Sequence, residues 1–210
     1  MINGAMTISN YLSFFILVFT IVYSPGPMTM FMMANGMKMQ YRNIWPILIG
    51  ANNAYLISII VFTVGLTQIL QQNMFILKTV QVAGIIYLLY LAYAQWNKKA
   101  VAGLTSEPLK ISNGSSLYTK GALIALSNPK TIILFGVIFP QFIVQGEHRL
   151  LQTVVFGVTF LALQFSSGCV YAYFGRRIKD LVEKPSYQIL MNKVSAVVLI
   201  VVAGFLLVKL

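Results

Sequence analysis

Charged side chains are scarce in this chain. Of its 210 residues only 9% are Asp, Glu, Lys or Arg, whereas soluble domains carry about 25%. Hydrophobic residues make up 58%, and the mean hydropathy is +0.80. So little charge leaves no room for a sizeable soluble domain, and it indicates an integral membrane protein.

The chain also lacks the side chains that enzymes and metal sites use. Its acids, its cysteine and its histidine are Glu107, Glu147, Asp180, Glu183, Cys169 and His148. All four acids fall in predicted loops, so no carboxylate pair or Ser/His/Asp set can form within the membrane. A lone cysteine forms no internal disulfide and leaves no Cys/His metal spacing. We therefore expect no enzymatic activity, no cofactor and no bound metal.

Basic residues outnumber acidic ones and give a formal net charge of +11. In a soluble chain this excess would indicate a nucleic-acid partner. Here the basic residues gather in short loops between apolar runs, which is typical of membrane orientation. The expected partner is the lipid bilayer, and we expect no nucleic acid.

Six apolar runs approach or exceed the roughly 20 residues that a helix needs to cross a bilayer. They are Tyr11–Ala34, Ile44–Leu66, Phe75–Trp96, Gly121–Phe142, Leu150–Phe174 and Ile189–Val208. The N-terminus lacks a basic segment, and no small-residue cleavage site follows its apolar run. The first run is therefore predicted to be a retained span.

The loops between these runs alternate in charge. Loops one, three and five carry the basic residues Lys38, Arg42, Lys98, Lys99, Lys110, Lys120, Arg176, Arg177, Lys179 and Lys184, whereas loops two and four carry only Arg149. Positively charged loops stay in the cytoplasm. Both termini are therefore predicted to lie outside.

Three spans per half is an odd number, so the second half would be inserted upside down relative to the first. We divide the single transporter domain (1–210) into a first half (1–100), a cytoplasmic linker (101–117) and a second half (118–210). Arg42 precedes Gly50 by the same spacing as Arg149 precedes Gly157, a weak echo of such a repeat. The predicted fold is an all-α integral membrane protein of six transmembrane helices, arranged as two inverted three-helix repeats.

Proline breaks the first helix of each half. Pro25 and Pro27 remove the hydrogen bonds that the carbonyls of Ile21 and Tyr23 would accept. The second break is Ser127-Asn128-Pro129-Lys130. An unpaired backbone group in hydrocarbon costs several kcal/mol, so such breaks persist only against protein or beside a wet cavity. Two interrupted spans at matching positions point to the binding site of a transporter.

Lys130 falls near the middle of the fourth run, where a lysine should face the bundle interior or water. It is either a counter-charge for a substrate carboxylate or a cap on carbonyls freed by Pro129, chiefly that of Ala125. Three amides, those of Asn52, Asn53 and Gln164, are predicted to be buried. They suit either helix–helix hydrogen bonds or a zwitterionic ligand.

The break geometry suggests how a small amino acid would bind. A helix resuming after Gly26-Pro27 would offer N–H groups to an anion. The freed carbonyls of Ile21, Tyr23 and Ala125 would receive an ammonium group. The absence of carboxylates from the spans argues against a strongly cationic substrate and against a simple Asp/Glu proton relay.

Several motifs spread over nearly the whole chain carry a resemblance to a known family. They are Ser24-Pro25-Gly26-Pro27, Gly84-Ile85-Ile86-Tyr87-Leu88, Asn128-Pro129-Lys130, Phe139-Pro140-Gln141-Phe142, Arg176-Arg177-Ile178 and Asn192-Lys193. With these the chain resembles the LysE/RhtB family of amino-acid exporters. The resemblance implies a multi-pass efflux protein of the bacterial inner membrane, dependent on the proton motive force and compatible with a homo-oligomer. It assigns function to Pro25, Gly26, Pro27, Asn128, Pro129, Lys130 and Gln141.

The chain departs from that family at two positions. Tyr55 and Gln164 stand where many members carry an acid. The predicted function is export of a small neutral amino acid or derivative by alternating access. Two alternatives are a non-transporting scaffold or regulator that keeps the fold, and a metal-cation exporter, which the missing Cys, His and acid ligands disfavour.

Overall fold

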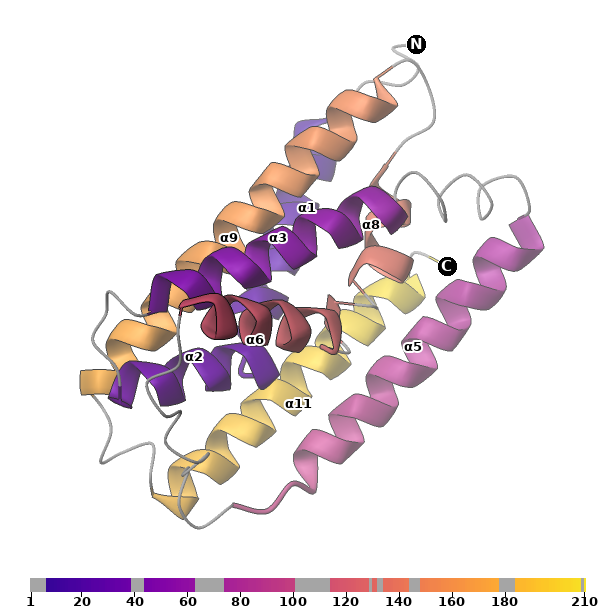
Figure 1. Ribbon diagram of the computed structural model, residues 1–210. Helices are drawn as coiled ribbons and strands as arrows, with labels where there is room; N and C mark the ends of the chain where they lie inside the picture. Colours follow the sequence, from indigo (N-terminus) through magenta and orange to yellow (C-terminus); the bar gives the residue numbers. More distant parts are fainter. Residues whose placement is uncertain are drawn as a thin grey trace.

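The computed structural model describes residues 7–38, 44–62, 74–100, 114–128, 130–131, 134–143, 148–177, 184–208 and 210. All regular structure within these residues is helical, as predicted (Figure 1). The elements are α1 (Ile8–Tyr23), α2 (Pro27–Lys38), α3 (Trp45–Val61), α5 (Met74–Trp96), α6 (Gly114–Leu126), the π-helical turn η3 (Leu134–Ile138), α8 (Phe139–Phe142), α9 (Arg149–Arg177) and α11 (Pro185–Val208).

Two helices in the described part of the chain, α9 and α11, are long and apolar enough to cross a membrane. The pair α1 and α2 would make a third span, bent by 51° at the break. Helix α3 is apolar but shorter, with 17 residues. The helix break at Ser24–Gly26 is therefore confirmed, while the six-span inverted repeat stays a prediction.

The outer surface of this bundle is apolar. Large hydrophobic side chains face outward along α3, α5, α9 and α11, among them Ile57, Phe75, Val158 and Val201. Contiguous apolar surface of this kind is rare on soluble monomers. Because lipid tails are as apolar as these side chains, the surface is that of a membrane protein.

The most extensive helix packing joins α3 to α6, α2 to α9 and α5 to α11 (Figure 1). Each pair takes one helix from the first predicted half and one from the second. The described elements of the two halves are therefore interleaved.

Glycines allow two of these pairs to touch backbone to backbone. A Cβ at Gly50 would overlap the Tyr118 carbonyl oxygen on α6, and one at Gly121 would overlap the Ile47 carbonyl oxygen on α3. Gly36 and Gly175 meet the backbones of α9 and α2 in the same reciprocal way. Gly157, which the sequence echo matches to Gly50, makes only ordinary contact with Ile59, so the two glycines pack differently.

Helical segments also lie on both sides of the second break. Helix α6 ends at Leu126, and the turn η3 begins at Leu134 and leads into α8. Pro129 lies outside the described residues, as do residues 101–113 of the predicted linker. The last four linker residues, 114–117, form the start of α6.

The glycine contacts give a first testable prediction. Gly50→Ala should lower the melting temperature of the detergent-purified protein, because over-packing a tight site costs about 1–3 kcal/mol. Gly204→Ala on α11 is the control, since a Cβ there meets no described atom within 4 Å. It should be neutral or stabilising by up to about 1 kcal/mol through helix propensity. Equal melting temperatures for the two variants would contradict the close α3–α6 packing.

Candidate functional site

The carbonyls that the first break frees are satisfied by the protein itself. The Ser24 hydroxyl donates to the Ile21 carbonyl at 2.8 Å, and the Tyr171 hydroxyl donates to the Tyr23 carbonyl at 2.7 Å. At the second break the backbone N–H of Asn128 donates to the Ala125 carbonyl at 3.3 Å. These are the three carbonyls that the sequence offered to an ammonium group, and none of them is open.

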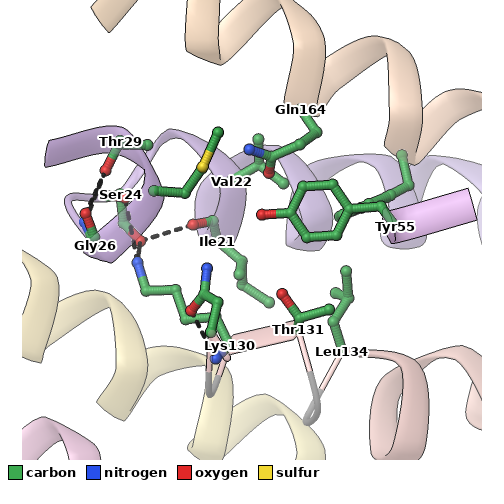
Figure 2. A pocket seen from close by; sticks show the side chains of 13 residues that line it. Ile21, Val22, Ser24, Gly26, Thr29, Tyr55, Lys130, Thr131, Leu134 and Gln164 are labelled. Carbon is green, nitrogen blue, oxygen red and sulfur yellow. Dashed lines mark hydrogen bonds between the residues drawn. The ribbon is translucent and has the colours of Figure 1, made fainter. Parts of the chain in front are cut away.

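The oxygens that do accept hydrogen bonds from an ammonium group belong to Ser24 and Pro25, the next two residues after Tyr23. The Lys130 ammonium donates to the Ser24 hydroxyl at 2.6 Å and to the Ser24 carbonyl at 3.2 Å (Figure 2). It also donates to the Pro25 carbonyl at 2.8 Å. The lysine therefore caps carbonyls of the first break, not the Ala125 carbonyl beside it. The two breaks, more than a hundred residues apart in sequence, meet through this side chain.

Neighbouring groups hold both sides of this contact in place. The Ser195 hydroxyl on α11 donates to the Pro25 carbonyl at 2.6 Å. The Thr29 hydroxyl accepts from the Gly26 N–H at 2.7 Å and donates to the Gly26 carbonyl at 3.0 Å. The Lys130 backbone N–H donates to the Asn128 side chain at 3.1 Å. Helix α2 resumes directly after these bonds, and its first intrahelical bond runs from Met30 N–H to the Gly26 carbonyl at 2.9 Å.

A small cavity of about 20 Å³ lies beside the Lys130 ammonium. Its walls come from α1, the first break, α2, α3, the second break, η3 and α9. They are formed by Ile21, Val22, Ser24, Gly26, Met28, Thr29, Tyr55, Asn128, Lys130, Thr131, Leu134, Phe160 and Gln164. This volume holds about one water molecule. A cavity of this size is too small for an amino acid.

Tyr55 and Gln164 bring polar groups to the side of the cavity opposite the lysine (Figure 2). Tyr55 is 1% exposed, and its hydroxyl has no partner with good hydrogen-bond geometry among the described residues, although the side chains of Asn128 and Thr131 lie close enough to interact with it. Burying a hydroxyl without a partner costs about 1–3 kcal/mol. An unpaired hydroxyl aimed into a cavity is what a site for a polar ligand would contain.

An aromatic cluster stands behind the cavity. Phe160 lines it and packs edge-on against Phe135, with ring centroids 4.9 Å apart. Phe135 contacts Phe139, Phe139 contacts Phe14, and Phe14 contacts Phe142. This chain of buried rings leads from the cavity to the end of α1 at which Asn10 donates to the Phe142 carbonyl at 2.8 Å.

Some of the residues singled out from the sequence lie away from the cavity. Asn52 is partly buried and donates to the Leu161 carbonyl at 3.4 Å. Asn53 is exposed and donates to the Tyr118 hydroxyl at 3.0 Å, so the prediction that it is buried is wrong. Gln141 does not line the cavity, although its side-chain oxygen is buried without a partner among the described residues. Pro27 is exposed at the start of α2.

The sequence analysis did not select several residues that shape the site, namely Thr29, Tyr55, Thr131, Tyr171 and Ser195. Thr29 is the third residue of α2, a position from which a side chain can reach back to the N–H of the residue before the helix, as in a capping box, and this spacing could have identified it. Tyr55 was noted only as a departure from a family pattern. Tyr171 and Ser195 give no local signal, because they reach the break from helices that are distant in sequence.

The site carries no acidic group in the part of the chain that the structure describes, since all four acids fall outside it. Within the same residues, no three His, Cys, Asp or Glu side chains gather as metal ligands would. Among the described residues that line the cavity, Lys130 is the only one with a charged side chain.

Comparison with known proteins supports the resemblance seen in the motifs. The family model described as LysE type translocator matches residues 19–210. The homoserine/homoserine lactone efflux protein of Salmonella typhi is 26% identical over 170 residues, which cover 81% of this chain and 82% of that protein. The threonine efflux protein of the same organism is 27% identical over 123 residues, covering 57% and 60%. A membrane protein of Vibrio cholerae is 24% identical over 188 residues, covering 90% and 91%. No solved structure matches.

The hydrogen bonds at the break predict the effect of removing one hydroxyl. Ser24→Ala deletes both the donor to the Ile21 carbonyl and an acceptor of Lys130, so it should destabilise the protein by about 1–3 kcal/mol. Ser58→Ala is a matched control, because Ser58 is also buried but donates only to the Ala54 carbonyl within its own helix. The measurement is thermal unfolding of both variants in detergent. A Ser24 variant as stable as the Ser58 variant would contradict the bonding described for the break.

Proposed function

The chain belongs to the LysE type translocator family, and from that premise we propose that it exports a small neutral amino acid, or a close derivative of one, across the bacterial inner membrane. The relatives named as homoserine and threonine efflux proteins support an amino-acid cargo. The observation that carries the proposal is the small cavity, lined partly by polar groups, at the meeting point of the two helix breaks.

The groups around the cavity suit a zwitterion. The carbonyls of Ser24 and Pro25 are acceptors for an ammonium group. The N-terminal end of α2 offers N–H donors for a carboxylate. Tyr55 and Gln164 offer neutral polar contacts to a side chain. A strongly cationic side chain is disfavoured, because no described acid would balance it.

Export requires that the site open to each side of the membrane in turn. Because the present cavity holds about one water molecule, it corresponds to a closed intermediate of alternating access. In this proposal the moving bodies are mixed pairs such as α2 with α9 and α3 with α6, since these pack most extensively. The aromatic cluster from Phe160 to Phe142 would separate the cavity from the outside.

Orientation and energy source complete the proposal. Both termini lie outside, because the basic loops are odd-numbered in a chain of six spans built as two inverted halves, 1–100 and 118–210. The proton motive force drives export. A homo-oligomer is compatible with the family.

The proposal is tested by measuring efflux of a panel of amino acids from bacteria that overexpress the protein. Lys130→Ala should reduce export to the level of cells that lack the protein, because it removes the charge at the site. Lys78→Ala, which removes an exposed lysine of α5, should export normally. Normal intracellular accumulation of every amino acid, with the protein present in the membrane, would favour a scaffold or regulator. Metal tolerance of the same strains tests a metal-cation cargo.

Gln164 provides a test of substrate contact. Gln164→Leu should raise the KM for the exported amino acid by about tenfold or more, since losing a hydrogen bond to a buried polar group costs about 1–3 kcal/mol. Asn53→Leu makes the same change on the exposed face of α3 and should leave KM unchanged. The measurement is initial transport rate against concentration in vesicles. Equal KM values for both variants would exclude Gln164 from the binding site.

A further inference from the structure

The Lys130 ammonium is fully coordinated. It has three N–H donors, and the Ser24 hydroxyl, the Ser24 carbonyl and the Pro25 carbonyl accept them at 2.6, 3.2 and 2.8 Å. We call these three oxygens the carbonyl cradle. Gly26 keeps the approach open, because a Cβ there would lie 2.9 Å from the Lys130 nitrogen. The cradle is thus shaped around a primary ammonium group.

Backbone oxygens at an unwound helix are the groups with which transporters bind small cations. Here the cation is a side chain of the protein. An amino acid brings the same chemical group, a primary ammonium, to the same cavity. The cradle cannot hold the Lys130 ammonium and the substrate ammonium at the same time, because the two positive charges would be in contact and would repel each other.

Lys130 is also the group at the cradle whose charge can change. The titratable side chains that face it are phenols, Tyr55 from α3 and Tyr171 from α9, which are neutral at physiological pH. Helix α11 presents the Ser195 hydroxyl, while its Lys193 lies over the Trp96 ring at 5.4 Å. No described carboxylate is available to balance or to carry a proton.

From these contacts we propose that Lys130 is the proton carrier of the transporter, and that its protonated amine competes with the ammonium group of the exported amino acid for the carbonyl cradle. This inference rests on the proposed function and adds the coupling step to it. Mutually exclusive binding of proton and substrate at one place is sufficient for exchange transport.

The cycle balances in protons and charge. On the cytoplasmic side the Lys130 ammonium gives its proton to water and leaves the cradle, and the substrate ammonium takes its place. On the outer side the neutral amine takes a proton from water, returns to the cradle and displaces the substrate. One proton enters for each zwitterion that leaves, so one positive charge moves inward and the membrane potential also drives export.

The first test uses purified protein in liposomes with the amino acid found in the efflux panel. Vesicles that are acidic inside should accumulate it through the wild type. Lys130→Met should lower this accumulation at least about tenfold and leave a slower exchange that no longer responds to pH. Lys130→Arg should lower both at least about tenfold, because a guanidinium stays protonated. Lys78→Met is the control for loss of a lysine outside the site and should behave as the wild type does.

The opposite pattern would overturn the inference. A lysine that acts only as a counter-charge for the substrate carboxylate predicts that Lys130→Arg keeps gradient-driven accumulation. It also predicts that Lys130→Met loses exchange altogether. Gradient-driven accumulation by either variant at the wild-type level contradicts proton carriage by Lys130.

The second test does not depend on transport, so it still decides on the cradle if the wild type moves no amino acid and the proposed function fails. Methylammonium chloride should raise the melting temperature of Lys130→Ala in a saturable way, because it fits the space left by the lysine. Tetramethylammonium chloride at equal ionic strength is the control, since it has no N–H donor. The wild type should not respond to methylammonium, because its own lysine occupies the cradle. Absence of a response in Lys130→Ala would show that the cradle is not a cation site.

Discussion

The structure depends on one constraint, which is that backbone polar groups cannot stay unpaired in an apolar surrounding. The break between α1 and α2 exposes carbonyls in the middle of a bundle. Each finds a donor: Ser24 from the break itself, Tyr171 from α9, Ser195 from α11 and Lys130 from the second break. Satisfying one short stretch of backbone therefore ties four parts of the chain together.

The helix packing also joins segments that are distant in sequence. Glycines at the α3–α6 and α2–α9 contacts let backbones touch, so that small residues replace the hydrophobic effect as the source of helix association. Both contacts join the first half of the chain to the second. The cavity consequently lies where the halves interleave, and any movement of the helix pairs alters it.

The polar groups that line the cavity differ in how fully their hydrogen bonds are satisfied. The Lys130 ammonium has every donor used, whereas the Tyr55 hydroxyl, 1% exposed, has no partner among the described residues. In the proposed transport cycle, a group that is satisfied in the present form exchanges its partners when a solute enters. An unsatisfied group gains one. In this proposal, the ammonium group of the solute replaces Lys130 at its acceptors, and the side chain of the solute forms a hydrogen bond with Tyr55.

The sequence by itself determined the membrane environment, the family, the helical class and the two breaks. These are local properties: scarcity of charge, apolar length, and prolines that remove particular hydrogen bonds. It also singled out Lys130, because a charge in mid-span needs an interior position. Only the tertiary structure decided which oxygens the lysine meets, that Asn53 turns outward, and that Tyr171 and Ser195 complete the break. Those outcomes depend on how helices rotate and pack, and residues more than a hundred positions apart leave no trace of their contact in the local pattern.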